Sequence, residues 1–168
     1  MQSKELSRRT DVIGTHSLAD LLDCPAATAS LLNDSARNLN FGEGEVVFRQ
    51  SGICQGLYLI VAGRFLRKSE RMPIRLTLGQ VYAGELEELA AVLGGGRHNY
   101  TLSAQTQGSV LLLPIEALNQ AFQSYPPLRM QLLEELAREV SRAYSACQMS
   151  CTIPSRTNSA DRPLTSGR

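Results

Sequence analysis

The chain has 168 residues, of which 43% are hydrophobic and 20% are charged. Its 17 basic and 16 acidic residues give a net charge of +1, so no overall field attracts nucleic acid or an anionic membrane. The first 20 residues contain no apolar signal segment, and apolar runs such as GLYLIVAG are too short to cross a bilayer. We therefore expect a soluble, cytoplasmic protein with one well-buried core.

The cysteine pattern does not predict a metal site. The chain has four cysteines, Cys24, Cys54, Cys147 and Cys151, and no Cys-x-x-Cys pair. Cys147 and Cys151 lie four residues apart in an expected helix, but zinc would need two more ligands. Only two histidines are available, His16 and His98. We expect packing for the cysteine pair, and no metal or cofactor.

Helices are expected near the N-terminus. Residues 1–16 are polar and aperiodic, which indicates a flexible N-terminus. Ser17 can cap a helix whose apolar residues Leu18, Leu21 and Leu22 recur at helical spacing. A second short helix, Ala26 to Leu32, follows Pro25.

The middle of the chain, about 40–115, predicts a mainly β fold. Short apolar runs alternate with glycine-containing turns, which indicates an antiparallel β-roll or jelly-roll. The expected strands are Val46–Phe48, Leu57–Ala62, Phe65–Lys68, Arg75–Leu78, Thr101–Ala104 and Val110–Ile115. A short helix, Leu86 to Leu93, is expected to interrupt them, because Glu85, Glu87 and Glu88 suit the positive end of a helix dipole.

Helical periodicity returns after the roll. A short helix, Ile115 to Phe122, should end at Tyr125-Pro126-Pro127, and a long helix is expected over about 128–150. Along it, apolar residues advance in steps of three and four, a pattern typical of helix pairing. These residues are Leu133, Leu136, Val140, Ala143 and Cys147. Packing on the chain's own roll and dimerisation both remain open. Residues 151–168 indicate a disordered tail.

Residues 17–148 resemble a known family in order and in motif. Phe41, Gly44-Glu45, Phe48, Gly52, Leu57-Tyr58-Leu59-Ile60, Gly63, Gly79 and Gly84-Glu85-Leu86 match its pattern. The family is the cyclic nucleotide-binding domain of catabolite-activator type regulators, regulatory kinase subunits and some ion channels. The resemblance implies one domain over 17–150 that binds cAMP, cGMP or a related anion.

The Gly84-Glu85-Leu86 tripeptide is the expected ligand cradle. Gly84 would let the backbone approach a phosphate, and the amides of Glu85 and Leu86 would donate to it. The resemblance assigns Glu85 the ribose hydroxyl. It also calls for an arginine farther along, because a guanidinium matches two phosphate oxygens.

Two registers are possible for that arginine. Counting forward from Glu85 selects Arg97, whereas counting backward from the strand Thr101–Ala104 places His98 there. Arg97 would give a permanent cation, and His98 a cation only when protonated. The expected ligand-binding residues are therefore Gly84, Glu85, Leu86, Arg97, His98, Asn99, Tyr100 and Thr101.

Catalysis is not predicted. Two histidines cannot supply the metal site of a cupin enzyme, and neither lies near a recognisable nucleophile. Gly94-Gly95-Gly96 is not followed by Lys-Ser or Lys-Thr, so it does not match a triphosphate-binding loop.

Two functions are expected from these patterns. The first is a ligand sensor that signals through its C-terminal helix to a partner protein or a second copy. The second is a ligand-free interaction or dimerisation module on the same fold. Direct DNA binding is not expected, because the residues after Ser150 are too few for a helix-turn-helix. A truncated regulator is a third, minor reading.

Overall fold

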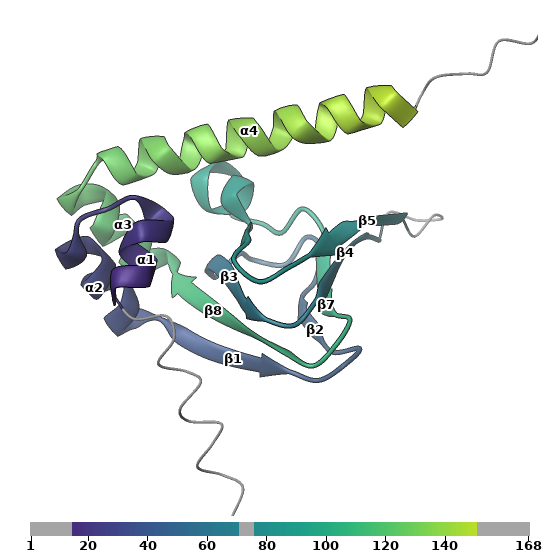
Figure 1. The fold of residues 1–168 in the computed structure, drawn as a ribbon, viewed down its shortest axis with the longest axis horizontal. Coiled ribbons are helices and arrows are strands. Elements are labelled where there is room, and N and C mark those ends of the chain that lie inside the picture. The colour runs from purple at the N-terminus through teal and green to yellow at the C-terminus, as the bar shows by residue number, and fades with distance from the viewer. Residues whose placement is uncertain (1–14, 71–75, 151–168) are drawn as a thin grey trace, which may run out of the picture. The chain divides into compact units, whose positions relative to one another are not determined.

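The computed structural model describes residues 15–70 and 76–150 (Figure 1). The expected tail 151–168, almost all of the flexible N-terminus and the Met72-Pro73 turn lie outside these residues. The chain divides into two compact units, Met1–Leu136 and Ala137–Arg168, and each is described by itself.

Four α-helices flank the roll in sequence. They are α1 (Thr15–Leu22), α2 (Ala26–Ser35), α3 (Ile115–Ser124) and α4 (Pro127–Ser150). Pro25 stands at the N-cap of α2, where its fixed φ of −57° suits a helix start and its missing N–H costs nothing. Helices were expected at all four places, and the structure confirms them.

Two four-stranded antiparallel sheets form the roll, which confirms the expected fold class. One sheet has the order β1-β8-β3-β6 and the other β2-β7-β4-β5. The strands are β1 (Arg37–Phe41), β2 (Val46–Phe48), β3 (Gly56–Ala62), β4 (Phe65–Ser69), β5 (Leu76–Val81), β6 (Leu86–Glu87), β7 (Thr101–Ala104) and β8 (Gly108–Pro114). β1 was not expected, because its sequence RNLNF contains only two apolar residues, Leu39 and Phe41, and no continuous apolar run.

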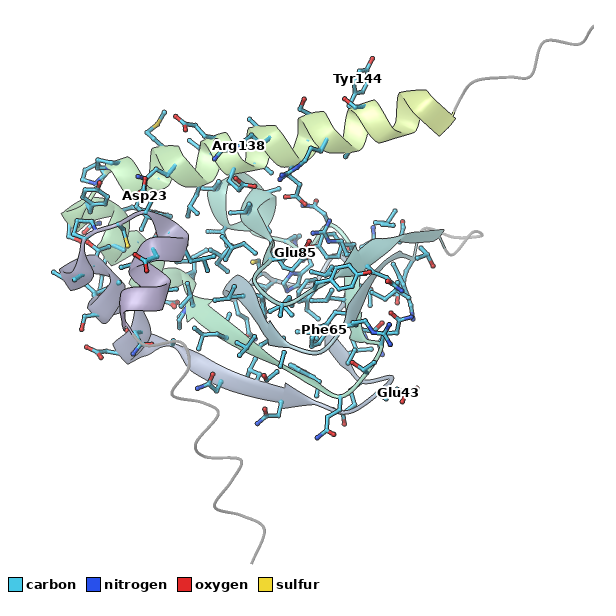
Figure 2. The ribbon with its side chains drawn as sticks, viewed as in Figure 1. Asp23, Glu43, Phe65, Glu85, Arg138 and Tyr144 are labelled. Carbon is cyan, nitrogen blue, oxygen red and sulfur yellow. The ribbon has the colours of Figure 1, made fainter. Side chains whose placement is uncertain are left out.

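Strand β3 separates two apolar cores. Leu57 and Leu59 face a core built with α1, α2, α3 and the start of α4. Tyr58 and Ile60 point the other way, into the roll, and pack with Phe65, whose side chain lies in the interior in Figure 2. Since both faces of β3 are covered, its first five residues are all buried. This two-sided burial produces the continuous apolar run in the sequence.

The expected helix at Leu86–Leu93 is wrong in its first half. Leu86 and Glu87 form strand β6, paired with Leu59 and Tyr58. Glu88 has a φ of +77°, and helical structure begins only at Leu89, continuing as a π-helix, η2 (Ala91–Gly95). The three glutamates therefore do not form the first turn of a helix.

Helix α4 begins in the first core and continues into the second unit. Leu128 and Leu132 are buried there, and Leu136 packs against them. Leu133, one of the expected pairing residues, is instead 38% exposed. Leu136 of the expected row thus packs in the chain's own core, whereas Leu132 takes the inward place expected for Leu133. No helix among the described residues has the length and hydropathy needed to span a membrane.

Candidate functional site

A group of charged and polar side chains is buried inside the roll, where β4, β6 and β7 meet. Glu87, only 1% exposed, accepts hydrogen bonds from Arg67 through both carboxylate oxygens. The Tyr100 hydroxyl donates to Oε2 of Glu87 at 2.5 Å, and the guanidinium lies 5.6 Å from the centre of the Tyr100 ring. The Arg67 and Glu87 charges compensate each other, with the carboxylate buried and the guanidinium partly exposed.

A second buried pair lies next to the first. Nδ1 of His98 is 3.0 Å from Oε2 of Glu88, and the two residues are 5% and 4% exposed. The imidazole stacks on Phe48, with ring centres 4.0 Å apart and planes inclined by 10°. This stacking fixes the orientation of the imidazole ring toward Glu88.

Burial controls the protonation of the groups around these pairs. It lowers the pKa of His98, because an imidazolium loses its hydration there. Burial, followed by the charges of Glu87 and Glu88, raises the pKa of Tyr100 far above its usual range. Burial also raises the pKa of the Cys54 thiol, and the Glu88 charge adds to the effect. The site therefore favours neutral imidazole, phenol and thiol groups.

The side chains of Arg97 and His98, which correspond to the two expected registers, point in different directions. Arg97 is exposed, and its guanidinium donates to the carbonyl oxygen of Ser51 at 2.8 Å. His98 faces the interior instead. The register counted backward from strand β7 therefore gives the inward side chain.

The Gly84-Glu85-Leu86 tripeptide lies in a turn and a strand rather than at a helix start. The exposed Glu85 accepts a hydrogen bond from the backbone N–H of Tyr82 at 2.9 Å. Its own N–H donates to the Tyr82 carbonyl at 3.2 Å, and the N–H of Gly84 donates to Ile60 at 2.8 Å. The N–H groups of Gly84 and Glu85 are thus bonded within the fold, whereas the role of the tripeptide as a phosphate cradle stays a prediction.

A second turn, far from the buried network, has the same construction. Gly42 donates its N–H to the carboxylate of Glu45, and Glu45 donates its N–H back to the Gly42 carbonyl. Gly44 has a φ of +83° and Gly84 a φ of +93° at equivalent places, a conformation that glycine adopts at low cost. Glu85 therefore performs the structural role that Glu45 performs elsewhere.

The remaining expected site residues take separate positions. Asn99 is exposed, whereas the side chain of Tyr100 joins the Arg67–Glu87 pair. Thr101 is buried, and its Oγ1 accepts a hydrogen bond from the N–H of Gln50. Of the eight expected residues, the structure brings His98 and Tyr100 to the buried network.

The sequence analysis missed four residues of this site: Cys54, Arg67, Glu87 and Glu88. Arg67 and Glu87 are separated by 20 positions, and they meet only because β4 and β6 lie in facing sheets. The adjacent apolar residues Phe65 and Leu66 do signal that β4 is partly buried. An arginine within that strand was the available indication of an inward charge.

Comparison with known families and structures gives a consistent result. The family model of the cyclic nucleotide-binding domain matches residues 38–125. The catabolite activator protein of Thermus thermophilus aligns at 21% identity and a TM-score of 0.64, over 74% of this chain and 59% of that one. A search of curated proteins finds no match.

Two further solved structures share the fold. The cAMP complex of the Toxoplasma gondii PKA regulatory domain has 16% identity and a TM-score of 0.64, over 82% of this chain and 51% of that one. A cyclic nucleotide-binding domain from Methylobacillus flagellatus has 14% identity and a TM-score of 0.71, over 83% and 85%. The chain thus spans between half and three-fifths of the first two proteins.

Proposed function

The chain belongs to the cyclic nucleotide-binding domain family, and from this premise we propose that it is a ligand-sensing regulatory domain rather than an enzyme. The observation that carries the proposal is the buried polar network. Charged side chains inside a core are costly unless they are paired, and they are concentrated at functional sites. Here two carboxylates, a guanidinium and an imidazole meet inside residues 38–125.

We place the ligand at Glu88 and His98 rather than at the exposed turn of Gly84 and Glu85. A cyclic mononucleotide, cAMP or cGMP, or a related small anion is the ligand class implied by the family. His98 is the inward side chain that could pair with a phosphate, because Arg67 is engaged with Glu87. Binding then requires the imidazole to exchange the Glu88 carboxylate for the phosphate.

The Glu88 charge sets the affinity in this proposal. A carboxylate within a few ångströms of a phosphate repels it, and low dielectric surroundings strengthen that repulsion. We therefore expect weak binding by the natural chain. Neutralising Glu88 should tighten binding roughly tenfold, which corresponds to about 1.4 kcal/mol.

We propose helix α4 as the output. Its first residues, Leu128 and Leu132, are buried in the core that also contains Leu89 at the start of the helical segment after Glu88. A ligand that moves Glu88 would act on this shared core. The signal would then pass to a partner protein or to a second copy of the chain.

Titration calorimetry with cAMP and cGMP tests the proposal on the full chain. The informative variant is Glu88→Gln, and its matched control is Glu85→Gln, the same change three residues earlier in an exposed turn. His98→Arg installs a guanidinium at the inward position, with Arg97→Lys as its neighbouring control. We expect tighter binding in Glu88→Gln and His98→Arg and unchanged binding in both controls.

Two results would contradict this assignment. Absence of heat with either nucleotide in the natural chain, Glu88→Gln and His98→Arg would remove the cyclic nucleotide as ligand. Binding that responds to Glu85→Gln or Arg97→Lys alone would return the site to the exposed turn.

A ligand-free interaction module is the second candidate, and a separate observation favours it. Met130, Leu133 and Val140 recur along α4 at steps of three and seven, and they are 58%, 38% and 59% exposed. Apolar residues at this spacing form one stripe along a helix, the pattern by which helices pair. A second copy of α4 is the occupant that we propose for this stripe.

Sedimentation equilibrium distinguishes this module from a monomeric sensor. We expect a dimer for the natural chain and a monomer for Leu133→Glu/Val140→Glu. Glu134→Gln, a change in an exposed charged residue on the same helix, is the control and should remain dimeric. A monomer at all concentrations of the natural chain would exclude the module.

A further inference from the structure

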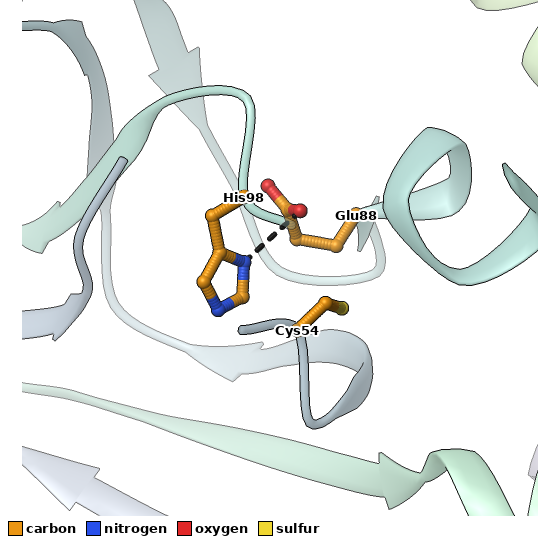
Figure 3. Close-up of side chains that lie close together, drawn as sticks. All are labelled: Cys54, Glu88 and His98. Atoms are coloured by element: carbon orange, nitrogen blue, oxygen red, sulfur yellow. Dashed lines mark ion pairs between the residues drawn. The ribbon is translucent and has the colours of Figure 1, made fainter. Parts of the chain in front are cut away.

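Three buried side chains with metal-ligating atoms converge beside the network. Cys54 lies in the loop before β3, Glu88 directly after β6, and His98 shortly before β7 (Figure 3). One ligand atom from each lies within 4.8 Å of the other two. The residues are at most 5% exposed, so the three atoms meet away from bulk water.

The chemistry of this group matches a borderline divalent cation. Thiolate, imidazole and carboxylate are the ligands that zinc takes in proteins, and three of them leave a fourth position for water or another ligand. Zn–N and Zn–O bonds of about 2.0–2.1 Å place two ligand atoms about 3.3 Å apart in a tetrahedron. The 3.0 Å between Nδ1 of His98 and Oε2 of Glu88 is close to this separation.

The backbone holds two of the three ligands together. Cys54 donates its N–H to Gly96, and His98 donates its N–H to Gly52 while accepting from Ser51. These bonds join the segment before β3 to the segment before β7. The stacking of His98 on Phe48 then limits the rotation of the imidazole. Preorganisation of this kind lowers the cost of ordering the ligands around an ion.

The backbone of Glu88 provides an independent indication of a functional site. Its φ of +77° is a left-handed conformation, which costs a non-glycine residue energy. The conformation turns the chain from β6 toward the helical segment and places the carboxylate inside. Backbone strain of this type is concentrated at functional sites.

We propose that Cys54, Glu88 and His98 form a three-ligand site for a divalent transition-metal ion of the zinc type. Histidine binds such ions through a neutral imidazole nitrogen, and Nδ1 of His98 faces Glu88 at 3.0 Å. The Cys54 thiol now donates to the Gly56 carbonyl at 3.2 Å, and it would release its proton when it binds the ion.

This site goes beyond the proposed function, because it does not require that a cyclic nucleotide binds. No spacing motif in the sequence predicts this site. Its ligands come from three separate segments, whereas the zinc patterns considered in the sequence have closely spaced ligand pairs. The expectation that the chain holds no metal is replaced by this proposal.

Cobalt(II) titration of the metal-stripped full chain is the direct test. A cysteine ligand produces a thiolate-to-cobalt charge-transfer band, and tetrahedral geometry intensifies the visible d–d bands. We expect both signals to saturate at one equivalent of cobalt and to be lost in Cys54→Ala. In His98→Gln, we expect the affinity for cobalt to fall at least about tenfold. Cys24→Ala and the double variant Cys147→Ser/Cys151→Ser are controls and should retain the bands.

Thermal unfolding with added zinc keeps the test decisive if a variant is poorly folded. A metal that binds the folded chain raises its Tm, so the natural chain should be stabilised and a folded His98→Gln chain much less. A folded natural chain without a cobalt band would overturn the site. So would a band that survives Cys54→Ala and disappears in the Cys147→Ser/Cys151→Ser variant. Neither result depends on nucleotide binding, so the two proposals can fail separately.

Discussion

The turn Ala83–Glu85 and the segment Glu87–Leu89 lie within seven residues of each other, yet their environments are opposite. Glu85 is exposed and bonds within its own turn, whereas Glu87 and Glu88 are buried among side chains from distant strands. The two regions contain the same type of residue. What differs is the strand β6 between them, which directs the chain from the surface into the roll.

This comparison shows that a short motif is weak evidence for the position of a side chain. The Gly-Glu-Leu letters match the family pattern, but the amides of Gly84 and Glu85 and the Glu85 carboxylate are already bonded within the fold. The buried glutamates match no motif, but their desolvation requires compensating partners. Burial and pairing therefore indicate a second candidate site beside the predicted tripeptide.

The first way to test this contrast is Glu87→Ala, for which we expect the largest effect. Arg67 and Tyr100 lose their common acceptor inside the roll. Removing one partner of a buried ion pair costs about 3 kcal/mol of unfolding free energy, the lower end of the usual range, because the Arg67 side chain is 24% exposed. Urea unfolding followed by circular dichroism measures the change.

Glu87→Gln is the matched variant for this measurement. It retains the shape and one acceptor oxygen, so we expect a smaller loss than in Glu87→Ala. Equal losses in the two variants would mean that the carboxylate charge accounts for the whole effect, and no loss in Glu87→Gln would mean that the charge contributes nothing to stability.

The second test compares two consecutive residues, Arg97 and His98. His98→Ala removes the stacking on Phe48 and the contact with Glu88, so we expect a loss of about 2 kcal/mol in unfolding free energy. Arg97→Ala alters an exposed side chain with one hydrogen bond, and we expect less than about 0.5 kcal/mol. The same urea experiment compares them, and a larger loss in Arg97→Ala would reverse the assignment of the inward side chain.

The sequence was sufficient to predict most of the fold. Short apolar runs between glycine turns identified β2, β3, β4 and β7 nearly to the residue, because those strands bury at least one face. β1 was missed because RNLNF is mostly exposed and has no continuous apolar run. The helix expected at Leu86 was misplaced because acidic residues suit both a helix start and a set of inward ion pairs.

The site was predictable only in part, for a physical reason. His98 was one of two alternatives left open, and the count backward from β7 is the one that gives the inward side chain, since the register of a strand determines which neighbouring residues point inward. The inward position of Glu88 could not be predicted by counting along a strand, because its left-handed φ interrupts the alternation of side chains and is rare for a glutamate. Cys54 and Arg67 belong to other strands or loops, and only the three-dimensional pairing brings them to the site.

The third test compares two tyrosines. Tyr100→Phe removes the hydroxyl that donates to Glu87 and keeps the ring, so we expect a loss of about 1.5 kcal/mol, as for a hydrogen bond to a charged group. Tyr82→Phe removes a hydroxyl that donates to Gln80 at the exposed surface, and we expect a loss below about 0.5 kcal/mol. If the network stabilises β7, hydrogen exchange of the β7 amides should be faster in Tyr100→Phe than in Tyr82→Phe. Similar exchange rates and similar losses of unfolding free energy in the two variants would contradict the difference between the buried and the exposed hydroxyl.

The fourth test concerns the turn itself, where we expect the smallest effect. Glu85→Ala removes a hydrogen bond to the Tyr82 amide at the surface, and water can replace the carboxylate there, so the expected loss of unfolding free energy is about 0.5 kcal/mol. Glu45→Ala removes the equivalent bond to Gly42 in a turn without any proposed ligand. If Glu85 has only this structural role, the two variants lose the same stability in urea and leave cAMP and cobalt binding unchanged. A specific effect of Glu85→Ala on either ligand, absent from Glu45→Ala, would show that the turn takes part in binding after all.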